Sequence, residues 1–103
     1  MKKPPIPMLF FVPTLELAEQ LQSQLGEEVT GIISGKTGPL ELRRVITDQS
    51  NGERPYVVAT AAGATGWRAP LGTIVGFHPD FPQNLREQAL ARVPGVGRPV
   101  PHG

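Results

Sequence analysis

The chain of 103 residues contains no cysteine, which excludes disulfides and thiolate metal sites. Histidine is scarce, and His78 has no second ligand at metal spacing, so we expect no metal site. No apolar run approaches the ~18–20 residues that span a membrane. The short run that follows Lys2 and Lys3 is broken by prolines, unlike a signal peptide. We therefore expect a cytoplasmic protein with no membrane partner.

Charge is sparse and unevenly distributed, with a formal net charge of +1. Acidic residues outnumber basic ones in residues 1–53, whereas residues 54–103 carry five arginines against Asp80 and Glu87. Because the planar guanidinium matches phosphate geometry, the second half is the one suited to anions. The same arginines are equally compatible with an ordinary solvated surface.

Hydrophobic periodicity predicts a single small α/β domain. Short apolar runs indicate strands at 8–12, 29–34, 56–60 and 71–77. Apolar residues at helical spacing indicate a helix between Thr14 and Gly26, a second from Pro39 to a turn at 48–52, and a third over 84–92. Helices alternating with strands predict a three-layer domain with a mainly parallel sheet and right-handed crossovers. The strand and helix that usually complete such a sheet are missing, so we expect truncation at its C-terminal edge.

The stretch from Tyr56 to Pro70 is the strongest candidate for a site. Its first five residues form the strand predicted at 56–60, and the next six are nearly all small, including Gly63 and Gly66. Open α/β sheets bind ligands at the carboxyl ends of their strands, and small residues allow a close backbone approach there. We therefore expect a ligand-binding loop after this strand.

These segments resemble, in order and spacing, the second RecA-like (helicase C-terminal) domain of superfamily 2 helicases, in a RecA-like fold. Phe10 to Thr14 is similar to motif IV, and Gly31 to Thr37 is similar to the next strand of the family with its terminal glycine. Val58 to Pro70 is similar to motif V, V-A-T-x-x-x-x-x-G-x-x-x-P, and Gln88 to Arg98 is similar to a degraded motif VI. The resemblance implies a domain over residues 8–98, preceded by an extended lead at 1–7 and followed by a flexible tail at 99–103.

The resemblance also implies roles for single residues. The positions where the family contacts the nucleic-acid backbone are Thr14, Gly35, Lys36 and Thr60. Hydroxyls and backbone amides suit that task because they bind phosphate without recognising bases. The positions near the nucleotide of the interdomain cleft are Gly66, Arg92 and Arg98, and Arg98 would be an arginine finger acting in trans.

Three departures from the family limit what the resemblance implies. Motif VI has Gly95 where the family has its middle arginine, and motif V has Arg68 where an aspartate is common. No G-x-x-x-x-G-K-[ST] motif and no acidic Mg²⁺ motif occurs in the chain, so nothing here would hold the β- and γ-phosphates. We therefore expect no ATP hydrolysis by the chain alone, with ATP and Mg²⁺ engaged only beside a partner domain.

Structural explanations compete with these roles. Thr60 could simply end its strand, Lys36 could be a solvated loop residue, and Gly63 could serve a plain turn. Trp67 could stack on a base, or could be buried where it closes the sheet, which is the interpretation that we prefer. A Ser/His/Asp set is disfavoured because no serine lies on a nucleophile elbow.

Two functions from different classes follow. The first is a stand-alone helicase C-terminal-like domain that binds nucleic-acid backbone, with DNA favoured over RNA, or assists a separately encoded helicase motor. The second is a non-enzymatic regulatory protein that uses the RecA-like scaffold to dock on a replication or repair protein. A degenerate gene remnant without a selected activity is a weaker third hypothesis.

Overall fold

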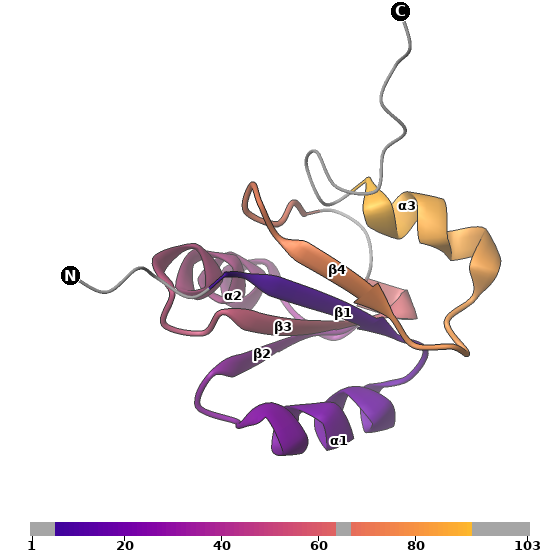
Figure 1. Cartoon of the computed structure of the whole chain (residues 1–103), viewed down its shortest axis with the longest axis horizontal. Helices are drawn as coiled ribbons and strands as arrows, with labels where there is room; N and C mark the ends of the chain where they lie inside the picture. Colours follow the sequence, from indigo (N-terminus) through magenta and orange to yellow (C-terminus); the bar gives the residue numbers. More distant parts are fainter. Residues whose placement is uncertain (1–5, 64–66, 92–103) are drawn as a thin grey trace, which may run out of the picture.

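The computed structural model describes residues 6–63 and 67–91 of the chain. The elements run in the order β1 (Met8–Val12), α1 (Leu15–Leu25), β2 (Thr30–Ile33), α2 (Pro39–Asn51), β3 (Tyr56–Thr60), the 3-10 turn η1 (Ala61–Gly63), β4 (Ile74–Phe77), the 3-10 turn η2 (Gln83–Leu85) and α3 (Arg86–Leu90) (Figure 1). The predicted α/β class is thus confirmed.

The four strands form one sheet in the order β2-β3-β1-β4, and every pair is parallel. Phe10 of β1 aligns with Val58 of β3 and with Gly76 of β4. β1 and most of β3 are apolar, which is typical of the central strands of a parallel sheet, and their residues are buried except for exposed Met8 and partly buried Phe10 and Tyr56. Among the described residues no strand lies beyond β4, so β4 is an edge strand.

The larger core lies on the side of the sheet where α2 packs, called the α2 face below. Phe11 is fully buried at its centre, and its ring packs against the rings of Trp67, Phe77 and Phe81 at centroid distances of 6.3, 5.1 and 5.6 Å. Val45 of α2 and Ala89 of α3 belong to the same cluster. Both helices therefore cover this face.

The opposite side, called the α1 face, carries only α1 among the described helices (Figure 1). Thr14 caps this helix, and its Oγ1 accepts a hydrogen bond from the backbone N–H of Leu17 at 3.3 Å. Ala18 is fully buried, and Leu17 and Leu21 pack beside it against Phe10 and Val58. Gly26 ends the helix at φ +113°, a conformation that glycine adopts without strain.

Three elements differ from the sequence prediction by more than one residue at a boundary. α2 continues to Asn51, through the segment predicted as a turn. Gly52 in the left-handed conformation ends the helix there, and buried Gln49 stabilises its last turns. The Nε2 of Gln49 donates to the carbonyls of Met8 and Pro55 at 3.0 and 3.2 Å. The strand predicted at 71–77 begins only at Ile74 because Pro70 to Thr73 form a turn, and the helix predicted at 84–92 is η2 followed by α3.

No helix within residues 6–63 and 67–91 has the length and hydropathy needed to cross a bilayer.

Candidate functional site

Four of the predicted contact residues lie at one edge of the sheet. Thr14 follows β1, Gly35 and Lys36 follow β2, and Thr60 ends β3. Because all four strands are parallel, their carboxyl ends meet at the same edge, called the carboxyl edge below. The other three predicted positions, Gly66, Arg92 and Arg98, lie outside the described residues, as do residues 1–5 of the lead predicted at 1–7 and the tail at 99–103.

The chain leaves β1 and β3 toward opposite faces of the sheet. From β1 the chain passes to α1 on the α1 face, whereas from β3 it passes through η1 to Trp67, which belongs to the core of the α2 face. β1 and β3 are neighbours in the sheet. Ligands of open α/β sheets bind where connections from adjacent strands diverge in this way. The carboxyl ends of β1 and β3 are therefore the expected binding position.

The turn after β2 is held by side-chain hydroxyls. The backbone N–H of Ser34 donates to Thr37 Oγ1 at 2.9 Å, and the N–H of Lys36 donates to Ser34 Oγ at 3.2 Å. The N–H of Thr37 donates to the Ser34 carbonyl at 3.1 Å. Gly35 and Lys36 are exposed at the tip of this turn. Since the Lys36 amide is used within the turn, what this residue offers to a ligand is its ammonium group.

Thr60 and Thr14 are both engaged in local capping. Thr60 is 4% exposed, and its Oγ1 accepts a hydrogen bond from the N–H of Gly63 at 3.3 Å. Thr14 is exposed and its Oγ1 is the cap of α1 described above. A hydroxyl that accepts one hydrogen bond still has its own O–H to donate. Of the two, Thr14 is the one whose hydroxyl is open to solvent.

Gly63 lies very close to other backbone atoms, and these atoms belong to this chain and not to a ligand. A Cβ at this position would lie 2.8 Å from the Cα and carbonyl carbon of Ser34 and 2.9 Å from the carbonyl oxygen of Ile33. A Cβ on Gly35 would lie 3.0 Å from the Cβ of Ala62. The glycines and alanines after β2 and β3 thus let the two turns pack directly on each other.

Trp67 is buried, as the sequence interpretation preferred. It is 6% exposed, its ring stacks on Phe11, and its Nε1–H donates to the carbonyl of Gly63 at 2.6 Å. A base could not stack on this ring without unfolding the loop. Trp67 therefore fixes the end of η1 against the core.

Charge at the carboxyl edge is low in the part of the chain that the structure describes. Lys36, after β2, is the cation in the turns that directly follow the strands. Two acidic residues are also close to strand ends in the sequence, Glu16 in the first turn of α1 and Asp80 after β4. Arg68 instead lines a shallow hollow of about 350 Å³ against α2, together with Arg43 and Trp67. The guanidinium of Arg86 lies 5.2 Å from the centre of the Phe77 ring on the α2 face.

The chemistry available at this edge is binding. Within the described ranges no three His, Asp or Glu side chains are grouped to hold a metal ion. The donors at this edge are the Thr14 hydroxyl and the Lys36 ammonium, which suit phosphate oxygens. The role of the Ser34 and Thr37 hydroxyls in this turn was not predicted from the sequence. Their positions on either side of Gly35 and Lys36 could have indicated it, because serine and threonine hydroxyls commonly bond to nearby backbone in turns.

No protein-family model matches the chain, and a search of curated proteins finds no match either.

Proposed function

We propose that this chain is a RecA-like module that contacts the phosphate backbone of nucleic acid through its carboxyl edge and acts beside a separately encoded helicase motor, without hydrolysing ATP itself. The observation that supports this function is that Thr14, in the exposed turn after β1, and Gly35 and Lys36, in the exposed turn after β2, lie at the same carboxyl edge on either side of the end of β3. Exposed hydroxyl and ammonium donors without an adjacent exposed aromatic ring favour phosphate contact over base recognition.

The low cation content of this edge predicts weak binding. Each phosphate neutralised on single-stranded nucleic acid contributes about −0.7 to the slope of log K against log salt, and on duplex DNA about −0.9. Lys36 accounts for one such contact. A module of this kind would add positioning to a complex whose affinity comes mainly from the motor, and ATP and Mg²⁺ would bind only with the motor's domain.

Nucleic-acid binding is tested by fluorescence anisotropy of the full chain with labelled single-stranded DNA, duplex DNA and RNA over a series of salt concentrations. We expect micromolar-range binding at low salt, and Lys36→Ala should reduce the salt slope by about one. Arg54→Ala is the matched control, because Arg54 precedes β3 at the opposite edge of the sheet. Absence of binding at low salt, or equal effects of the two substitutions, would refute this function.

A second function is favoured by a different observation, an apolar groove beside α1 that no described element covers. Here the chain is a non-enzymatic interaction protein that uses the same scaffold to dock on a replication or repair protein. Exposed apolar grooves mark interaction sites in soluble proteins. Retained protein binding together with an absence of nucleic-acid binding would favour this function over the first.

A further inference from the structure

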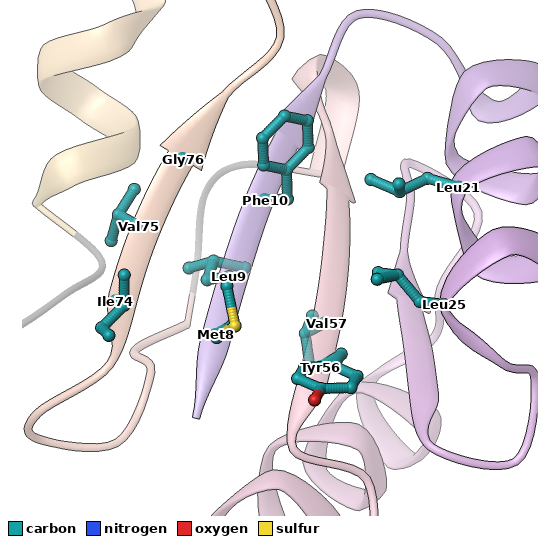
Figure 2. A pocket seen from close by; sticks show the side chains of 10 residues that line it. All are labelled: Met8, Leu9, Phe10, Leu21, Leu25, Tyr56, Val57, Ile74, Val75 and Gly76. Atoms are coloured by element: carbon teal, nitrogen blue, oxygen red, sulfur yellow. The ribbon is translucent and has the colours of Figure 1, made fainter. Parts of the chain in front are cut away.

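The hollow between α2 and the loop before β4, called the arginine hollow below, is lined by arginines from two separate segments. Arg43 comes from α2 and Arg68 from the loop, and the hollow has a volume of about 350 Å³. The groove beside α1, by contrast, is lined by uncharged residues that include Met8, Leu25 and Ile74 (Figure 2). The arginine hollow therefore carries a charge that indicates a class of ligand, whereas the groove carries none.

The floor of the arginine hollow is apolar. Leu42 and Ile46 are four residues apart, so they lie on one side of α2, and both line the hollow together with Trp67. Trp67 is 6% exposed, and the other two are partly buried against the same core cluster. An apolar side chain that entered the hollow would contact all three residues. A nucleobase would find no exposed aromatic ring on which to stack.

The two arginines of the hollow have no carboxylate partner within residues 6–63 and 67–91. Both are exposed, and no acidic side chain in these ranges lies within 4.0 Å of either guanidinium. The nearest acidic residue of α2 in sequence, Glu41, lies 3.9 Å from Arg44 instead. Glu41 precedes Arg43 by two residues, a spacing at which helical side chains do not face each other. The hollow thus offers two positive charges to a ligand.

An apolar floor between two arginines fits an acidic peptide segment that contains a large apolar residue. A guanidinium can bind a carboxylate through two parallel N–H bonds. Small-molecule sites bury most of the ligand surface, which a shallow hollow cannot do, so a single side chain of a larger partner is the better fit. Leu40, three residues before Arg43, is 83% exposed and adds apolar surface on the same side of α2.

We propose that the arginine hollow binds an acidic segment of a separate protein, with one large apolar side chain on the floor and flanking carboxylates paired with Arg43 and Arg68. Residues 92–103 of this chain contain no acidic side chain and cannot supply these carboxylates. Nucleic acid is disfavoured because its phosphates would pair with the arginines and leave the apolar floor in water. The inference goes beyond both functions above and depends on neither the carboxyl edge nor the groove beside α1.

The probe is a short capped peptide with a central leucine and glutamates on both sides. Trp67 is the single tryptophan of the chain and lines the hollow, so its fluorescence reports occupancy of this site. Replacing the glutamates of the peptide by lysines should weaken binding to the full chain by at least about tenfold, since like charges across an interface are costly. Replacing its leucine by serine should also weaken binding by about tenfold, because the apolar contact with the floor is lost.

Variants of the chain separate the arginines of the hollow from their neighbours. Arg43→Gln and Arg68→Gln should each weaken peptide binding by about tenfold, because each removes one charge-assisted pair. Arg44→Gln is the matched control, since Arg44 is an exposed arginine of the same helix that does not line the hollow, and binding should change by less than about twofold. Lys36→Ala should leave peptide binding unchanged, so failure here is distinguishable from failure of nucleic-acid binding.

Four results would overturn the proposal. Equal binding of the acidic and basic peptides, or equal effects of Arg43→Gln and Arg44→Gln, would show that the hollow does not recognise carboxylates. Unchanged binding of the serine peptide would show that the floor takes no part. Displacement of the peptide by single-stranded DNA whose own binding needs Arg43 would assign the site to nucleic acid. Self-association in light scattering that both Arg43→Gln and Glu16→Gln abolish would make the occupant α1 of a second copy.

Discussion

Replacing Gly63 by alanine would place a methyl group against the backbone of the neighbouring turn. All three of its nearest atoms, in Ile33 and Ser34 at 2.8–2.9 Å, are main-chain atoms of β2 and its turn. These atoms cannot rotate away as the end of a side chain can. Overpacking of this kind costs about 1–3 kcal/mol, and the backbone contacts place this case near the upper value.

A smaller effect opposes the clash. Alanine restricts the unfolded chain more than glycine does, which stabilises the folded state by about 0.4–1 kcal/mol. We therefore expect Gly63→Ala to lower the free energy of unfolding by about 2 kcal/mol, or Tm by about 10 °C in a domain of this size. Trp67 is the single tryptophan, is buried and bonds to Gly63, so its fluorescence reports the transition.

Gly38→Ala is the matched control for this substitution. A Cβ on Gly38 meets nothing within 4 Å, and its φ of −74° suits alanine. Its unfolding free energy should stay within about 0.5 kcal/mol of the native value. If Gly63→Ala were as stable as Gly38→Ala, the turns after β2 and β3 could not be packed as closely as the structure shows.

Two further substitutions test how the loops and α2 are fastened. Trp67→Phe keeps the stack on Phe11 but leaves the buried carbonyl of Gly63 without its donor, so denaturant unfolding followed by circular dichroism should show a loss of about 1–3 kcal/mol; an unchanged midpoint would contradict the hydrogen bond. Gln49→Met keeps the side-chain volume but removes both hydrogen bonds to the carbonyls of Met8 and Pro55, and the same assay should show a loss of about 2 kcal/mol, with faster amide exchange at the end of α2.

The strands at 8–12 and 56–60 and the class of the fold were predictable from sequence because they depend on local pattern. A continuous apolar run such as Tyr56 to Thr60 indicates a strand buried on both faces, and alternation with helices requires parallel strands. Gly26 ends its helix where the sequence predicted. The extension of α2 through 48–51 was not predictable from local pattern. Buried Gln49 donates hydrogen bonds there to the carbonyl of Met8, which lies 41 residues away in the sequence, and to the carbonyl of Pro55, which lies beyond the end of the helix.

The candidate site, like the fold, was predictable from the sequence only in part. The sequence alone determined that Thr14, Gly35, Lys36 and Thr60 stand at strand ends, because strand ends are visible in the pattern of apolar runs. Only the tertiary structure decided which of them face solvent. Thr60 and Gly63 are turned inward by contacts with the turn after β2, and such contacts depend on the order of strands in the sheet.

The groove beside α1 was decided by tertiary structure alone. Met8, Leu25 and Ile74 have the apolar character of core residues, and in sequence nothing distinguishes them from Leu9 or Phe11. Their exposure arises because α1, which packs chiefly on β2 and β3, is the one described helix on its face, while α2 and α3 both lie on the other. Side-chain hydrophobicity determines which residues are favoured in a core, but the placement of the helices on each face of the sheet determines which of them are buried.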